Sequence, residues 1–231
     1  MSSQLANSRA VVTGAASGIG RAIAQDLAAR GARVIACDVN QAGLAETLAM
    51  LGEGCDSYVC DVSDHAQVEA LAAHVAATMG GCDLLFANAG VIVAGGYTRL
   101  TPAEVDWILG VNVRGVWSTT AVFARMMQGQ PGGGRICFTG SEHSLGFQHA
   151  GAGVYTASKH AVLGLAEILR AEAPENLGVS IFCPGLVGTA LGGGERPEGL
   201  PAVQRNTEMS ARIQARGMPV EEAARDAVDG T

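Results

Sequence analysis

A tyrosine and a lysine lie four residues apart in the segment Tyr155-Thr156-Ala157-Ser158-Lys159. On an α-helix this spacing places both side chains on one face, about one turn apart. The phenol of a free tyrosine has a pKa of about 10, so it exchanges protons poorly near neutral pH. A neighbouring ammonium group stabilises the phenolate and lowers that pKa. The pair therefore predicts proton-transfer chemistry, although such pairs also occur by chance on solvated helices.

A glycine-rich turn near the N-terminus has the form of a dinucleotide-binding site. The apolar segment Arg9–Thr13 predicts a short buried strand, and the turn GAASGIG that follows it leads into a helical segment. Strand, glycine turn and helix in this order are typical of dinucleotide binding. Gly14 would permit the tight bend, Gly18 the approach of the backbone to the pyrophosphate, and Gly20 close packing of helix on strand. The pyrophosphate would then lie at the positive end of the helix dipole. The alternative is a purely structural turn.

An aspartate follows the next predicted strand, Arg33–Cys37. Asp38 lies roughly 20 residues past the glycines, where an acidic side chain accepts hydrogen bonds from the ribose hydroxyls of adenosine. Its carboxylate would repel a 2′-phosphate, and neither the turn Ala15–Ser17 nor the residues just after Asp38 supply a cation to attract one. This pattern favours NAD(H) over NADP(H). The alternative is an aspartate that only caps a turn.

Further motifs follow, and with the glycine turn they resemble those of the short-chain dehydrogenase/reductase family. The turn Thr13-Gly14-x-x-x-Gly18-Ile19-Gly20 is similar to the cofactor motif of that family, and Tyr155 with Lys159 is similar to its catalytic pair. The similarity extends from about Arg9 to Thr189. The other similar segments are Asp61-Val62, Asn88-Ala89-Gly90, Val111-Asn112-Val113, Ser141 and Pro184-Gly185-x-Val187-x-Thr189.

The resemblance implies one domain over residues 1–231 with a Rossmann-like α/β fold, a doubly wound parallel β-sheet flanked by helices on both faces in three α/β/α layers. The alternation of short apolar strands with helical segments independently predicts parallel βαβ units. Thr101-Pro102-Ala103-Glu104 predicts a capped helix start with proline at the first helical position. Family members end with a strand that this chain lacks after a helix expected near Pro219, so either the sheet is one strand short or a tail is missing.

The resemblance also implies a role for each motif residue. Tyr155 as phenolate takes a proton from the substrate hydroxyl while hydride passes to NAD⁺, and Ser141 fixes the reacting oxygen. Lys159 lowers the pKa of Tyr155 and holds the cofactor ribose. Asn112 holds a water that passes the proton on, or only distorts its helix. The implied cofactor-binding residues are Gly14, Ser17, Gly18, Ile19, Gly20, Asp38, Asp61, Val62, Asn88, Ala89, Gly90, Tyr155, Lys159, Pro184, Gly185, Val187 and Thr189.

The position of the catalytic serine departs from the family pattern. The serine of the family stands about thirteen residues before the tyrosine, but here that position is Glu142, and Ser141 stands fourteen before. Ser141 remains the expected catalytic residue because it directly follows the predicted strand Arg135–Gly140, and a loop longer by one residue absorbs the difference. Ser144 is the alternative.

The expected substrate is a neutral secondary alcohol or its ketone. In the family, the segment at about 190–217 forms the substrate lid, and its glycines suggest a movable flap. Apolar residues there and at Val91–Val93 predict a mostly apolar pocket, with Gln148 or His149 as a polar wall. Two alternatives compete with this prediction. One is NADPH-dependent reduction of carrier-bound 3-ketoesters, and the other is a non-catalytic dinucleotide-sensing protein.

Composition narrows the partners to small molecules. The net charge is −7 without a basic cluster, which disfavours nucleic acid and anionic membrane surfaces. No apolar run approaches the roughly 18 residues of a membrane span, so a cytoplasmic location is expected. Six cysteines without a CxxC pattern predict reduced thiols and no metal site. The resemblance implies pairing through helices over about 112–128 and 155–171, giving a homodimer at least, with a homotetramer as the larger option.

Overall fold

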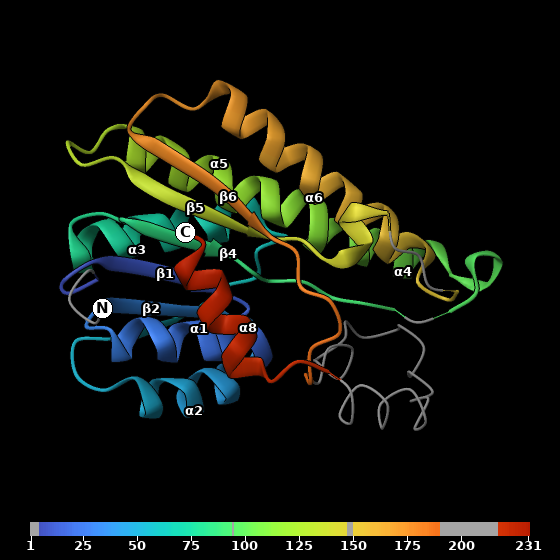
Figure 1. Cartoon of the computed structure of the whole chain (residues 1–231), viewed down its shortest axis with the longest axis horizontal. Helices are drawn as coiled ribbons and strands as arrows, with labels where there is room; N and C mark the ends of the chain where they lie inside the picture. Colours follow the sequence, from blue (N-terminus) through green and yellow to red (C-terminus); the bar gives the residue numbers. More distant parts are fainter. Residues whose placement is uncertain (1–4, 94, 147–149, 190–216) are drawn as a thin grey trace.

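A six-stranded parallel β-sheet forms the centre of the computed structural model, which describes residues 5–93, 95–146, 150–189 and 217–231 (Figure 1). The strand order is β3-β2-β1-β4-β5-β6, and every neighbouring pair is parallel. The order reverses between β1 and β4, and ligands of such sheets bind outside the carboxyl ends of the strands at that point. The strands are β1 (Arg9–Thr13), β2 (Arg33–Asp38), β3 (Asp56–Val59), β4 (Leu84–Ala87), β5 (Gly134–Thr139) and β6 (Leu177–Phe182).

Helices cover both faces of the sheet, which confirms the three-layer α/β/α fold (Figure 1). Alternate strand residues serve the two sides: Val11 and Ile35 pack on the side of α3, α5 and α6, whereas Val12 and Val34 pack on the side of α1, α2 and α8. The four central strands, β2, β1, β4 and β5, are mostly buried and mainly apolar, whereas the edge strands β3 and β6 are only partly buried. The helices are α1 (Gly18–Ala29), α2 (Gln41–Leu51), α3 (His65–Met79), α4 (Pro102–Leu109), α5 (Val116–Gln128), α6 (Gly153–Glu172) and α8 (Val220–Asp229).

The helix expected from Asn112 begins differently from the prediction. Residues Gly110–Gly115 form a π-helical segment, η2, and the α-helix α5 starts only at Val116. A side chain on Gly115 would lie 2.9 Å from Val62 Cγ2, so the segment passes very close to the loop after β3. The wider turn places Asn112 inside the protein, with no solvent exposure. In contrast, the capped start of α4 is as predicted, because Thr101 and Glu104 form a capping box.

The C-terminal helix α8 packs beside α1, and the chain ends next to β5 (Figure 1). Arg135 Nη1 donates to the carbonyl oxygen of Thr231 at 3.0 Å. No strand follows β6 within the described ranges, so β6 is an edge of the sheet there. None of the described helices is long and apolar enough to cross a membrane.

Candidate active site

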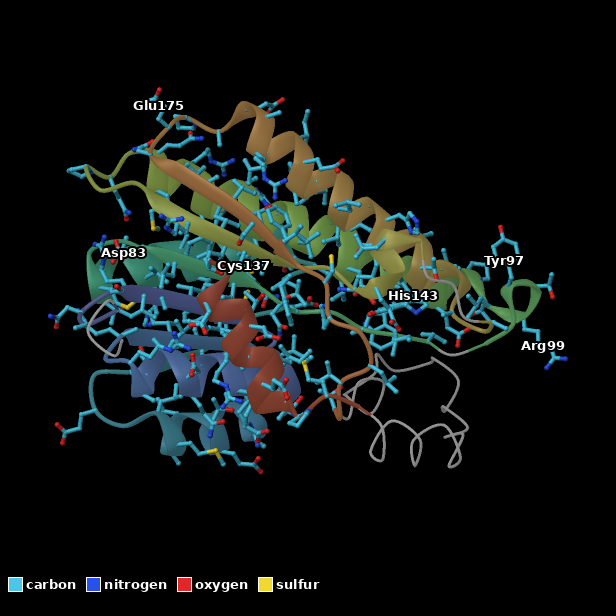
Figure 2. All side chains as sticks on the ribbon, in the orientation of Figure 1. Asp83, Tyr97, Arg99, Cys137, His143 and Glu175 are labelled. Atoms are coloured by element: carbon cyan, nitrogen blue, oxygen red, sulfur yellow. The ribbon has the colours of Figure 1, made fainter. Side chains whose placement is uncertain are left out.

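The carboxyl ends of the strands gather most of the predicted site residues, whereas the amino ends hold none of them. Figure 2 shows this polarity: Asp83 and Glu175 lie at the amino ends of β4 and β6, and His143 lies at the opposite end, beside the start of α6. The loops that leave β1, β2, β4 and β5 therefore build the candidate site together. Their contacts decide what each residue does.

The glycine turn after β1 is shaped by close contacts that exclude larger side chains. Gly14 has a φ of +68°, and a Cβ there would lie 2.8 Å from the Cα of Ala89. A Cβ on Gly20 would collide with the Gly14 carbonyl oxygen and lie 2.6 Å from Asn88 Nδ2. Gly14 thus forms the bend and Gly20 allows α1 to begin directly against it, as the sequence predicts.

The start of α1 fits an anionic ligand such as a pyrophosphate. Ser17 precedes the first turn without capping it through its side chain, and no acidic residue lies in that turn. The N–H groups at a helix start attract anions, and here no side-chain anion competes for them. Thr189 lies across this turn, with its Cβ 3.4 Å from where a Cβ on Gly18 would stand. The segment after β6 therefore reaches the glycine turn.

Asn88 joins the turn to the end of β4. Its Nδ2 donates to the carbonyl oxygens of Thr13 at 3.1 Å and of Gly14 at 3.4 Å. The Thr13 hydroxyl in turn accepts from the backbone N–H groups of Asn88 at 3.0 Å and Ala89 at 3.1 Å. These bonds hold the ends of β1 and β4 together.

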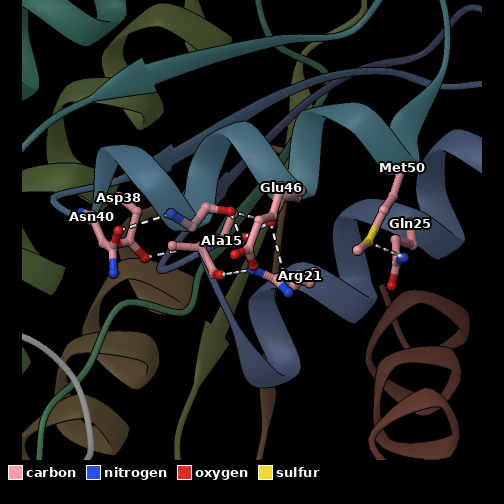
Figure 3. Close-up of polar contacts among 10 residues, drawn as sticks. Ala15, Arg21, Gln25, Asp38, Asn40, Glu46 and Met50 are labelled. Atoms are coloured by element: carbon pink, nitrogen blue, oxygen red, sulfur yellow. Dashed lines mark hydrogen bonds and ion pairs between the residues drawn. The ribbon is translucent and has the colours of Figure 1, made fainter.

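Asp38 accepts two backbone hydrogen bonds at the end of β2 (Figure 3). One comes from the N–H of Ala16 at 3.0 Å and the other from the N–H of Asn40 at 3.0 Å. The bond to Asn40 is the turn-capping contact, and the bond to Ala16 ties the carboxylate to the glycine turn. Asp38 therefore caps a turn and also lies where the sequence predicts a ribose contact.

Tyr155 and Lys159 lie on one face of α6 and are almost fully buried, with 8% and 4% of their surfaces exposed. Lys159 Nζ donates to the carbonyl oxygen of Thr139 at 2.8 Å and lies 5.8 Å from the centre of the Tyr155 ring. Burial lowers the pKa of Lys159 to about 8, because a charged ammonium loses hydration there. The prediction that Tyr155 and Lys159 lie on one face of a helix is therefore correct.

The electrostatics of Tyr155 differ from the expectation. Burial raises the pKa of Tyr155 above its usual value, a hydrogen bond with Ser141 lowers it, and the charge of Glu142 raises it. Lys159 does not lower this pKa in the protein alone, where its ammonium donates to the carbonyl oxygen of Thr139 and lies 5.8 Å from the centre of the Tyr155 ring. Desolvation of the phenolate therefore dominates the pKa of Tyr155 in the protein without cofactor.

The two candidate serines have separate tasks. Ser141 accepts a hydrogen bond from the N–H of His143 at 3.3 Å and is hydrogen-bonded to the Tyr155 side chain. Ser144 Oγ donates to the carbonyl oxygen of Lys159 at 2.7 Å and accepts from the N–H of Ser141 at 3.2 Å. Ser144 therefore fastens the loop to α6, whereas Ser141 is the serine that affects the pKa of Tyr155.

Asn112 holds the loop after β4. Its Nδ2 donates to the carbonyl oxygen of Val91 at 2.9 Å and to Ser158 Oγ at 3.0 Å, and its Oδ1 accepts from the N–H of Val91 at 2.8 Å. A Cβ on Gly90 would lie 3.5 Å from Asn112 Oδ1 and 3.6 Å from Lys159 Nζ. The glycine thus keeps open the space between the two side chains. Asn112 therefore links the loop after β4 to α6, which is a structural role.

Two residues close to Tyr155, Glu142 and His143, have no catalytic role predicted from the sequence. The N–H of Glu142 donates to the carbonyl oxygen of Pro184 at 2.9 Å, and Oε2 lies 3.4 Å from where a Cβ on Gly185 would stand. His143 is buried with its ring edge-on to Tyr155 at 5.4 Å, and its Nδ1 lies 2.8 Å from Thr156 Oγ1. The serine spacing shows that Glu142 occupies the position of the family's serine, but spacing alone does not predict that its carboxylate affects Tyr155.

The remaining predicted residues are placed as follows. Asp61 accepts a hydrogen bond from the N–H of Ser63 at 2.8 Å, just beyond β3, and Val62 is buried against Gly115. Val187 is buried and bridges to Met218. Gln148, His149 and, apart from residue 217, the expected lid at 190–217 lie outside the described residues. The cysteines within the described ranges are free thiols, and those ranges contain no group of three or more metal-binding side chains.

Comparisons with known proteins show the family to which this chain belongs. The family model described as short chain dehydrogenase matches residues 8–198. D-threitol dehydrogenase of Mycolicibacterium smegmatis is 39% identical over 196 residues, which cover 79% of this chain and 71% of that protein. D-beta-hydroxybutyrate dehydrogenase of Cupriavidus necator is 33% identical over 223 residues, which cover 95% of this chain and 81% of that protein.

A solved structure shows the same fold. The short chain dehydrogenase/reductase from Burkholderia phymatum, described in complex with NAD, matches with a TM-score of 0.90 at 33% identity over 98% of this chain and 86% of that chain. The family model covers most of the chain, and the hydroxybutyrate dehydrogenase and the solved structure are each 33% identical over most of both chains. This chain therefore belongs to the short-chain dehydrogenase/reductase family of oxidoreductases.

Proposed function

We propose that this protein interconverts a secondary alcohol and a ketone with NAD(H). The observation that carries the proposal is the buried cluster of Ser141, Tyr155 and Lys159 beside the glycine turn. A buried tyrosine and lysine with shifted pKa values are unfavourable for stability, and such groups are typical of catalytic sites. A protein that only sensed a dinucleotide would not need them.

The residues around the turn fit a dinucleotide. The uncapped start of α1 would receive the pyrophosphate, and Asp38 would accept hydrogen bonds from the adenosine ribose. When bound, NAD(H) would supply the hydride acceptor or donor. Asp38 favours NAD(H), because its carboxylate would repel the 2′-phosphate of NADP(H).

The protein's own task at the reaction end is to hold and move a proton. In the oxidising direction Tyr155 would accept the proton of the substrate hydroxyl at Oη, and in the reducing direction it would return that proton to the carbonyl oxygen. Ser141 would hold the reacting oxygen next to the tyrosine. Since burial raises the pKa of Tyr155, the phenolate depends on positive charge from Lys159 and from an oxidised nicotinamide.

A neutral hydroxyl compound is the substrate class that the surroundings favour. Two relatives are named as dehydrogenases of D-threitol and D-beta-hydroxybutyrate, which supports a hydroxyl-bearing substrate. Glu142 lies close enough to raise the pKa of Tyr155, so it would also repel an anionic substrate bound there. A neutral alcohol or polyol is therefore favoured over a hydroxy acid.

The function is tested by measuring turnover. Purified protein is given a panel of neutral secondary alcohols, polyols, hydroxy acids and ketones, with NAD(H) and NADP(H) in parallel, and reduced nicotinamide is followed by absorbance. We expect turnover with NAD(H) and a neutral alcohol or ketone. Turnover that requires NADP(H) would overturn the cofactor proposal, and no turnover by folded protein that binds NADH would favour a sensor.

Pairing of two copies through α5 and α6 is also proposed. Trp117 on α5 and Ile168 on α6 are large apolar side chains that are about half exposed, at 49% and 54%. A second copy that covered both helices would bury them. Light scattering at micromolar concentration should give at least a dimer, and a monomer would contradict the proposal.

A further inference from the structure

The part of the glycine turn nearest Asp38, which we call its ribose end, consists of Ala15 and Ala16, and their backbone groups are hydrogen-bonded to neighbouring elements. The N–H of Ala15 donates to the carbonyl oxygen of Cys37 at 3.0 Å, and its own carbonyl oxygen accepts from Thr47 Oγ1 at 2.8 Å. The N–H of Ala16 donates to Asp38 Oδ2 at 3.0 Å, and the carbonyl oxygen of Ala16 accepts from Arg21 Nη2. All four backbone polar atoms of these two residues are therefore satisfied.

Arg21 connects this turn to helix α2 (Figure 3). Besides Ala16, its Nη2 reaches the carbonyl oxygen of Gly43 at 3.2 Å and the Glu46 carboxylate at 2.9 Å, and its Nε donates to Thr47 Oγ1 at 2.9 Å. The Arg21 side chain is only 22% exposed, while the side chain of its partner Glu46 is 66% exposed. Because exposed ion pairs contribute little to stability, the pair with Glu46 serves mainly to orient the arginine.

Packing makes the turn sensitive to that arginine. A Cβ on Gly43 would lie 2.8 Å from the Cβ of Ala16, so α2 begins directly against the turn. Ala16 is 4% exposed, and its carbonyl oxygen would lose a charged donor in a place with little water if Arg21 were removed. The same peptide segment carries the N–H that holds Asp38, so a shift of Ala16 would move the predicted ribose acceptor.

We infer that Arg21 is a positioning residue for the adenosine half of the cofactor. Its side-chain contacts are with Ala16 and with α2, so it would act on the cofactor only through the turn. Its guanidinium holds Ala16 against α2, and Ala16 in turn holds Asp38 in the orientation that accepts the ribose hydroxyls. Arg21 directly follows the last glycine of the motif, but its side chain is directed away from the cofactor side of the turn, toward α2. This inference depends on the proposed NAD(H) function.

The test compares Arg21→Met with a matched change on the same helix. Arg30 directly follows α1, at the opposite end of that helix from the glycine turn. It is also ion-paired, to Asp26 and Asp229, and its side chain is 24% exposed. Arg30→Met therefore controls for the loss of an ion-paired arginine. Dissociation constants for NADH and for ADP-ribose, which lacks nicotinamide, are measured by calorimetry for the unmodified protein and both variants.

We expect Arg21→Met to raise both dissociation constants by about tenfold or more and by the same factor, because the defect lies in the adenosine half. Arg30→Met should leave both within about twofold of the unmodified protein. If Arg21→Met does not fold, Arg21→Lys, which keeps the charge but loses the fork of donors, should show the same pattern with a smaller factor.

Unchanged ADP-ribose affinity in the folded Arg21 variant, or an equal loss in Arg30→Met, would overturn the inference. Failure of the unmodified protein to bind NADH would be a different result, because it would overturn the proposed function rather than the role of Arg21.

Discussion

The two ends of the candidate cofactor site treat charge in opposite ways. At the ribose end, Asp38 accepts two backbone N–H groups, and Arg21 is paired with Glu46. At the reaction end, Lys159 is nearly inaccessible, has only the carbonyl oxygen of Thr139 within hydrogen-bonding distance in the described structure, and has a pKa of about 8. Charges are thus hydrogen-bonded or paired at the proposed ribose site and poorly compensated at the proposed proton-transfer site.

This difference indicates that the reaction end, rather than the ribose end, lowers the stability of the fold. A hydrogen-bonded, partly hydrated charge costs little, so the ribose end can be rigid without destabilising the fold. A buried ammonium and a buried phenol are costly, but their shifted pKa values make proton exchange responsive to small changes in charge nearby. Changes at the reaction end should therefore affect rate and stability in opposite directions, whereas changes at the ribose end should affect affinity.

The largest effect is expected from Tyr155→Phe. The substitution removes the hydroxyl that we propose exchanges a proton with the substrate. The kcat should therefore fall by about 10²–10⁴, while the dissociation constant of NADH stays unchanged. Tyr97→Phe is the matched control, since Tyr97 is 79% exposed and lies at the far tip of the molecule (Figure 2). Steady-state kinetics that show a loss of less than tenfold would remove Tyr155 as the acid or base.

Lys159→Met should make the protein inactive but more stable. Methionine fills similar space without a charge, so the free energy of unfolding near neutral pH should rise by about 1–3 kcal/mol. The lysine loses its proton near pH 8 in the folded chain and near 10.5 when unfolded, so the unmodified protein gains stability as pH rises between these values. The advantage of the variant should therefore be largest below pH 8 and shrink above it.

Urea unfolding at neutral and at alkaline pH measures this difference. A Lys159→Met protein that is less stable than the unmodified protein at neutral pH would show that Lys159 stabilises the fold, contrary to the comparison between the two ends.

Asp38→Asn should weaken discrimination between the two cofactors. Asparagine keeps an acceptor for Ala16 and removes the charge that repels a 2′-phosphate, so the ratio of NADPH to NADH dissociation constants should fall by about tenfold. Asp64→Asn, the same change in an exposed cap of α3, should leave the ratio unaltered. A ratio that does not respond to Asp38→Asn would remove charge at Asp38 as the source of preference.

The smallest effect is expected from Glu142→Gln. The charge of Glu142 raises the pKa of Tyr155, so its removal should lower that pKa. Because the oxidation rate rises with pH as the phenolate forms, the rising limb of the pH profile of kcat should move to lower pH in the variant. A shift to higher pH would show that Glu142 acts on Tyr155 in another way.

Local patterns predicted the parts of this protein that depend on neighbours in sequence. The four-residue spacing placed Tyr155 and Lys159 on one face of α6, and the glycine motif predicted the tight bend at Gly14 and the close packing at Gly20. The capping box at Thr101 was also correct. Each of these features is decided within one or two turns of chain.

Other features depend on distant parts of the chain and were missed or wrong. The π-helical segment that buries Asn112 is set by Val91 and Val62, which lie on other loops. The sign of the pKa shift of Tyr155 depends on burial depth, which residue spacing does not reveal. The contact of Arg21 with α2 joins two helices separated by a strand. Burial and long-range contacts decide all three.

The most direct test of the account follows one hydrogen atom. A neutral secondary alcohol that the protein oxidises is prepared with deuterium on the carbinol carbon, and the NADH formed from NAD⁺ is examined by mass spectrometry. We predict one deuterium on the nicotinamide ring for each alcohol oxidised, and formation of labelled NADH by the Tyr155→Phe protein that is slower by about 10²–10⁴. NADH that forms without the label, or labelled at an equal rate by Tyr155→Phe, would contradict hydride transfer assisted by Tyr155.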